Sequence, residues 1–241
     1  MPPKRATVVA QRIVRQIQKQ KLAPGTMLPA EHEMIEQYGV GRSTVREALR
    51  VLELQGVVTI RPGRGGGPIV STPDSRHLAS TLALLMQFAE TPFRAAVEAR
   101  AWMEPITAAL CAERADAQLR AELQESINRM RAGLADSDVF LDENHRFHEL
   151  IAQGAANPVF SYFLNSLHWI TDGTPLGVEY PPRSRKAVLA AHERVWKAVE
   201  AGDASAAHEA MREHMEETLT YFERKYGSVM DEVLTWEMYG T

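Results

Sequence analysis

Three histidines in the second half of the sequence have the residue type and spacing for metal chemistry. His148 lies four residues after Asn144 in a helical pattern, so both side chains project from one helix face. His192 and His214 fall in two later helical patterns. A divalent ion needs three or four nitrogen or oxygen donors from separate elements, and imidazole suits Zn, Ni or Fe. These histidines can therefore form a metal site, although a buried histidine is more often simply hydrogen-bonded.

A second group of residues, between positions 42 and 64, is rich in arginine and has the side chains needed to contact nucleic acid bases and phosphates. An arginine can bond guanine O6 and N7 together, which discriminates against other bases by roughly 1–3 kcal/mol. Arg50 lies one turn after Arg46 and is better placed for a phosphate. Arg61 and Arg64 adjoin flexible glycines and can reach the DNA backbone or the minor groove. The candidate DNA-binding residues are Arg42, Ser43, Thr44, Arg46, Arg50, Arg61, Gly63 and Arg64.

The elements that must position these arginines are those of a winged helix-turn-helix. Two helical patterns, a glycine turn, a third helix capped by Ser43 or Thr44, and a strand pair with a Pro- and Gly-rich tip follow in order. The expected helices are 6–20, 30–37 and one that ends at 54, and the expected strands are 57–61 and 68–71. In this motif the start of the second helix meets base edges in the major groove. Double-stranded DNA is therefore the expected partner.

The charge of the chain is unevenly distributed. Residues 1–75 carry 11 Lys and Arg against 6 Asp and Glu, whereas the remaining residues carry 16 against 25. A basic module joined to an acidic one is typical of a DNA-binding head on a body that does not touch DNA. We therefore expect a DNA-binding domain over residues 1–75 and a second domain over residues 76–241.

The second domain is expected to be an all-α bundle. Long helical patterns fill it, Pro and Gly are sparse outside two loops, and no strand-like alternation follows the wing. The expected helices are 76–90, 93–114, 116–133, 136–153, 158–170, 183–201 and 203–225. The fold class is therefore mostly α, with an N-terminal winged helix-turn-helix and a C-terminal helical bundle.

Composition excludes several other classes of protein. The single cysteine, Cys111, rules out an internal disulfide and a cysteine-based metal site. No apolar run approaches the roughly 18 residues of a membrane span, and the N-terminal residues lack a signal-peptide core. A cytoplasmic protein without a membrane partner is the expectation.

The first domain resembles the GntR family of bacterial transcription regulators. The resemblance rests on residues 24–31, 40–49 and 54–59 and covers residues 6–71. It implies that Arg42, Arg46 and Gly63 contact operator DNA, with Thr44 nearby. The family usually carries an arginine that contacts DNA where this chain has His32, so the resemblance implies that one contact and the preferred operator differ here.

The second domain resembles the helical ligand domain of the FadR-type branch, the FCD domain. Residues 141–158, 192–207 and 211–214 carry this likeness. It implies a divalent metal, most plausibly Zn or Ni, bound by His148, His192 and His214, with Asn144 where the family usually has aspartate. An amide brings no negative charge, so the ion should bind less tightly and attract a carboxylate effector more strongly. Asp142 faces elsewhere and is a poor substitute.

Arg100 matches a family arginine near the ligand pocket and can pair with an effector carboxylate through two hydrogen bonds. A surface pair with Glu104, one turn later, is an equally good interpretation of the spacing.

His145, His168 and His208 are expected to be structural or exposed. The aromatic residues Phe147, Phe160, Tyr162, Phe163 and Trp169 are expected in the bundle core.

Together these features predict a homodimeric regulator, most commonly a repressor in this family, that responds to a small organic acid and is not an enzyme. A metal-sensing regulator is one alternative. A metal-dependent hydrolase is another, but no His-Glu pair continues to the second histidine of a zincin motif, and no carboxylate shares the helix face of His148.

Overall fold

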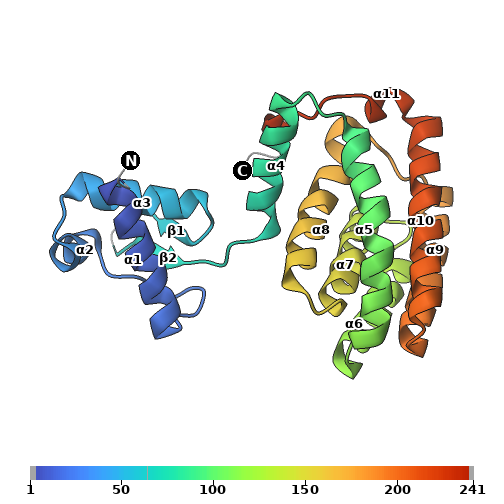
Figure 1. The fold of residues 1–241 in the computed structure, drawn as a ribbon, viewed down its shortest axis with the longest axis horizontal. Helices are drawn as coiled ribbons and strands as arrows, with labels where there is room; N and C mark the ends of the chain where they lie inside the picture. The colour runs from blue at the N-terminus through green and yellow to red at the C-terminus, as the bar shows by residue number, and fades with distance from the viewer. Residues whose placement is uncertain (1–3, 64, 239–241) are drawn as a thin grey trace. The chain divides into compact units, whose positions relative to one another are not determined.

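The computed structural model describes residues 4–63 and 65–238, and the contacts among them divide the chain into two units. The units are Met1–His77 and Leu78–Thr241, and each is described by itself. The expected fold class is confirmed, since a helix-turn-helix with a two-stranded wing precedes a helical domain (Figure 1).

The first unit forms a small core because apolar residues recur at helical spacing on three helices. Ile13, Met34, Val45 and Leu49 are among the buried side chains, and Val58 closes the core from the wing. The strands pair antiparallel, with Val58 opposite Val70. The elements are α1 (Arg5–Gln20), α2 (Glu31–Tyr38), α3 (Arg42–Leu54), β1 (Val58–Arg61) and β2 (Gly67–Val70).

The start of α3 differs from the expectation. The helix begins at Arg42, and its N-cap is Gly41, which makes no side-chain capping bond. The expected cap by Ser43 or Thr44 is therefore wrong, because both residues already lie inside the first turn. The side chain of Ser43 is exposed, and that of Thr44 is half-buried.

The second unit is a helical bundle in which α5 (Phe93–Arg114) packs most extensively against four other helices. Those helices are α7 (Ser137–Gly154), α8 (Pro158–Thr171), α9 (Pro182–Ala201) and α10 (Ala204–Lys225) (Figure 1). The remaining elements are α4 (Ser75–Phe88), α6 (Ala117–Ala132), η1 (Thr174–Leu176), α11 (Gly227–Met230) and η2 (Trp236–Met238). Because α5 touches so many neighbours, its buried polar residues can meet side chains from most of the bundle.

The segment after α10 packs back on the bundle. The Phe93 amide donates to the Glu232 carbonyl, and Pro92 forms a bridge with Val233. The Trp236 side chain donates to Ser80 in α4. No helix within the described residues is long and apolar enough to cross a membrane.

Candidate functional site

The exposed start of α3 carries two arginines that are open to solvent. The side chains of Arg42 and Arg46 are 73% and 70% exposed. Each lies near Glu31, with nitrogen–oxygen distances of 3.9 and 3.7 Å. Such exposed pairs contribute little energy, so Glu31 does not prevent either arginine from binding DNA. Arg50 is also exposed, and so is His32 at the start of α2.

The tip of the wing requires glycine at two positions. Gly63 has a φ of +98°, a conformation that residues with a side chain rarely adopt. A Cβ on Gly66 would lie 2.1 Å from the carbonyl oxygen of Arg61. Arg61 itself is exposed at the end of β1. Arg64, the remaining wing residue expected to meet DNA, lies outside the described residues.

Within the bundle, three helices bring His148, His192 and His214 together. The rings come from α7, α9 and α10, and all three residues are 7% exposed or less. One nitrogen from each ring lies within 4.8 Å of the others. The Nε2 atoms of His192 and His214 are 3.2 Å apart, within hydrogen-bond distance of each other. The histidines singled out by their spacing therefore do meet in space.

A fourth residue, Glu104 of α5, completes this cluster and was missed by the sequence analysis. Its Oε2 accepts a hydrogen bond from Nδ1 of His148. Its Oε1 accepts from Nε of Arg100 at 2.6 Å, and Arg100 also donates to the Thr171 hydroxyl at 2.7 Å. The Arg100–Glu104 pair expected from the spacing is thus present, but it is buried rather than on the surface.

The surroundings of the cluster fix its protonation near neutral pH. Burial would raise the pKa of Glu104, but Arg100 and His148 beside it lower that pKa to about 2. Burial, followed by the nearby His148, lowers the pKa of His214 to about 3. Burial also lowers the pKa of His192 well below its usual value. The cluster therefore holds an ionised carboxylate together with two neutral imidazoles, those of His192 and His214, and neutral imidazole is the form that ligates a metal.

The hydrogen bonds of the cluster fit a divalent metal. The Glu104 carboxylate orients His148 through Nδ1, which leaves Nε2 as the ring atom that would ligate a metal, and this support is usual for metal-bound histidines. Among the described residues, Nδ1 of His192 is buried and has no hydrogen-bond partner. The donor set therefore fits Zn or Ni. The His148 ring is oriented by a hydrogen bond to Glu104, whereas the His192 ring has no such partner among the described residues.

Other residues near the cluster complete its walls. The Phe147 ring stacks on His192 with 3.9 Å between centroids. His168 of α8 is buried, and its ring centroid lies 5.1 Å from that of His148. Asn144 lies one turn before His148 on α7 and is half-buried. Its amide remains a predicted ligand.

Two aromatic residues expected in the core lie on the surface instead. Tyr162 and Phe163 of α8 are 56% and 48% exposed. Helical periodicity identified the helix correctly, but it did not show that these two side chains lie on its exposed side. Phe147, in contrast, is fully buried as expected.

Comparison with known proteins places both units in described families. The model of the bacterial regulatory proteins of the gntR family matches residues 5–66, and the FCD domain model matches residues 95–217. The HTH-type transcriptional regulator YcbG of Bacillus subtilis (strain 168) is 30% identical over 210 residues, which cover 87% of this chain and 86% of that protein.

Two further similarities agree with this assignment. The galactonate operon transcriptional repressor of Escherichia coli (strain K12) is 28% identical and covers 81% of this chain and 87% of its own. The solved structure of Streptococcus agalactiae GntR superposes with a TM-score of 0.71 at 25% identity, covering 90% of this chain and 99% of that one. These relatives are transcription regulators and not enzymes, and this chain belongs to the GntR family of DNA-binding transcription regulators, in its FadR-type branch with an FCD domain.

Proposed function

We propose that this regulator is a repressor whose affinity for operator DNA is controlled by a small organic acid that binds at a metal centre in the helical domain. The start of α3 and the wing read the operator. His148, His192 and His214 hold the metal, with Asn144 as the fourth ligand. The observation that carries the proposal is the convergence of three buried imidazoles from three helices, one of them held by Glu104.

The charges around the cluster favour a carboxylate effector. Three of the proposed ligands are neutral, since His192 and His214 have lowered pKa values and Asn144 is an amide. Glu104 is ionised, but Arg100 balances its charge. A bound Zn or Ni ion supplies a positive charge to which a carboxylate can coordinate. One relative represses an operon named for galactonate, which is a sugar acid.

The burial of the cluster offers a route from binding to DNA release. His148, His192 and His214 are almost inaccessible, so an acid must move the surrounding helices to reach them. A bundle that changes shape on binding can alter operator affinity through a coupling of roughly 1–3 kcal/mol, or about 5–150-fold.

The proposal is tested by measuring operator affinity in the presence of two- to six-carbon hydroxy acids. His214→Ala should retain operator binding and lose the response to acid, whereas His208→Ala, at a half-buried position of the same helix, should keep both. A full response in folded His214→Ala would contradict a metal-centred pocket. Release by the metal alone, without any acid, would instead identify a metal sensor.

We also propose that two copies of the chain associate through an apolar face on α5 and α8. Trp102 is 80% exposed, and Ile106 follows it one turn later on α5. Tyr162 and Phe163 are exposed on α8, which packs against α5. Large exposed apolar patches commonly mark interfaces between proteins. A two-fold dimer would also match the two half-sites of a palindromic operator.

Sedimentation equilibrium tests this interface. Trp102→Glu should shift the protein toward monomer, because a charge would be buried in the interface. Gln118→Glu adds the same charge at an exposed position of α6 and should leave the dimer intact. An unchanged dimer in Trp102→Glu would place the interface elsewhere.

A further inference from the structure

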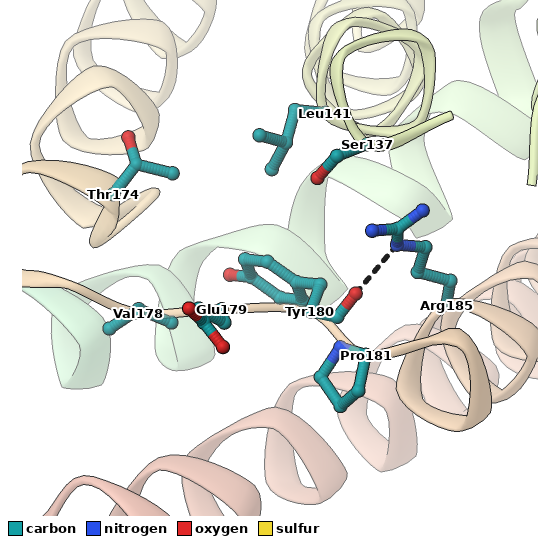
Figure 2. A pocket seen from close by; sticks show the side chains of 8 residues that line it. All are labelled: Ser137, Leu141, Thr174, Val178, Glu179, Tyr180, Pro181 and Arg185. Atoms are coloured by element: carbon teal, nitrogen blue, oxygen red, sulfur yellow. Dashed lines mark hydrogen bonds between the residues drawn. The ribbon is translucent and has the colours of Figure 1, made fainter. Parts of the chain in front are cut away.

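A separate cavity lies at the N-terminal ends of α7 and α9. Its volume is about 270 Å³, near the lower end of the roughly 300–1,000 Å³ of small-molecule sites. Figure 2 shows Ser137 and Leu141 of α7 on one side of it, Arg185 of α9 beside them, and Tyr180 on the opposite side. The cavity is therefore enclosed by two helices and the loop that precedes α9.

The cavity is distinct from the metal centre. Leu141 lies seven residues before His148 on α7, and Arg185 lies seven residues before His192 on α9. Seven residues are two helical turns, or about 10 Å along each axis. A small molecule bound beside Arg185 would therefore lie two turns from the candidate metal ligands, without coordinating a metal there.

Arg185 gives the cavity a fixed positive charge. Its Nε donates to the Tyr180 carbonyl at 2.6 Å, and Nη1 donates to the carbonyls of Leu134 and Ala135 at 3.1 and 3.2 Å. Within residues 4–63 and 65–238 no acid pairs with this guanidinium, and Nη2 has no hydrogen-bond partner. Three backbone carbonyls thus hold the side chain in place while its charge and one terminal nitrogen remain available.

One further polar group of the cavity lies beside this charge, and two lie farther from it. Ser137 contributes a hydroxyl next to Arg185, and Thr174 contributes one across the cavity (Figure 2). Glu179 lies at the rim and makes no ion pair with Arg185 within the described part of the chain. A ligand would meet a cation at one end and hydrogen-bond acceptors at the other.

We propose that this cavity is a second ligand site, which binds a small polyhydroxy carboxylate such as a sugar acid. The carboxylate binds Arg185 through a charge-assisted hydrogen bond, with Ser137 as an additional donor. The hydroxyl groups of the ligand donate to Glu179 and Thr174. The site needs no metal, which separates it from the proposed metal centre.

Isothermal titration of D-gluconate into metal-free protein tests this site, with D-glucitol as the probe that lacks only the carboxylate. The metal is removed with the uncharged chelator 1,10-phenanthroline, so that the chelator does not compete for Arg185. Gluconate should bind and glucitol should not. Absence of gluconate binding, or equal binding of both probes, would overturn the proposal.

Three variants locate the binding. Arg185→Gln should weaken gluconate binding at least tenfold, whereas Arg183→Gln, exposed on the same helix, should not change it. Because Arg185 also holds three carbonyls, Ser137→Trp provides an independent test: it fills the cavity from an exposed position and should abolish binding. Unchanged binding in either Arg185→Gln or Ser137→Trp would show that the ligand lies elsewhere. Failure here leaves the metal centre untouched, since His214→Ala tests that centre separately.

Discussion

Replacing Glu104 with glutamine should weaken metal binding although Glu104 is not itself a proposed ligand. The carboxylate accepts a hydrogen bond from Nδ1 of His148 and so orients the ring and strengthens it as a ligand. A glutamine can still accept this bond, but a bond to a neutral group is roughly half as strong. Loss of such a partner lowers metal affinity by roughly 10–100-fold, which corresponds to about 1.4–2.7 kcal/mol.

The assay is competition for Zn²⁺ between metal-free protein and a chromophoric chelator. Glu113→Gln, at an exposed position on the same helix, is the matched control and should bind Zn²⁺ like the unmodified chain. The expected order of affinity is therefore unmodified chain equal to Glu113→Gln, and Glu104→Gln clearly weaker.

The buried partner of Glu104 must be considered separately. Glu104→Gln leaves the Arg100 charge buried without its carboxylate, and breaking such a pair costs about 3–5 kcal/mol of stability. The double variant Arg100→Leu/Glu104→Gln removes both charges and should recover much of that stability, yet its Zn²⁺ affinity should remain low. Unchanged Zn²⁺ affinity in folded Glu104→Gln would refute the role assigned to this carboxylate.

Three further predictions concern DNA, pH and metal removal. Arg46→Ala should weaken operator binding by about 5–150-fold, since a bidentate base contact contributes roughly 1–3 kcal/mol; fluorescence anisotropy measures this, and Arg224→Ala in α10 should have no effect. The unfolding free energy of the metal-free protein should fall as pH drops below about 6.5, because His192 and His214 have lowered pKa values and the unfolded chain binds protons first. Each of these histidines should contribute a slope of up to about 1.4 kcal/mol per pH unit, and Glu104 should add to the loss between its ordinary pKa and about 2. A flat profile from pH 7 to 4 in denaturant titrations would contradict the buried neutral rings. Removing Zn²⁺ from protein saturated at a hundredfold excess over Kd should lower the midpoint of thermal unfolding by about 5–10 °C, and no such shift should occur in His214→Ala.

The elements of the fold could be predicted because local signals mark them. Pro24 and Gly25 end the first helical pattern, and the structure ends α1 at Gln20 with Lys21 as its cap. Apolar residues at helical spacing predicted α5 and α10 to within a residue at each end. Helical patterns placed the three histidines on separate helices, and the resemblance to the FCD domain distinguished them from His145 and His168, which lie on the same kind of helix.

The remaining parts of the site depend on contacts between distant helices. Glu104 and His148 are separated by 44 residues, and only the packing of α5 against α7 brings them together. The Arg100–Glu104 pair could be predicted from its spacing, but its burial could not. Likewise, periodicity places Tyr162 and Phe163 on α8 without showing that their side chains are exposed. The role of Arg185 could not be predicted, because two of its three carbonyl partners, Leu134 and Ala135, lie 51 and 50 residues away in the sequence.

Control of operator binding by an acid at the metal centre is tested most directly by measuring operator affinity with hydroxy acids in Zn²⁺-loaded and metal-free protein. The proposal predicts that one acid lowers the affinity of the loaded protein by about 5–150-fold. The same acid should leave metal-free protein and His214→Ala unaffected. An equal loss of affinity with and without metal would contradict the proposal.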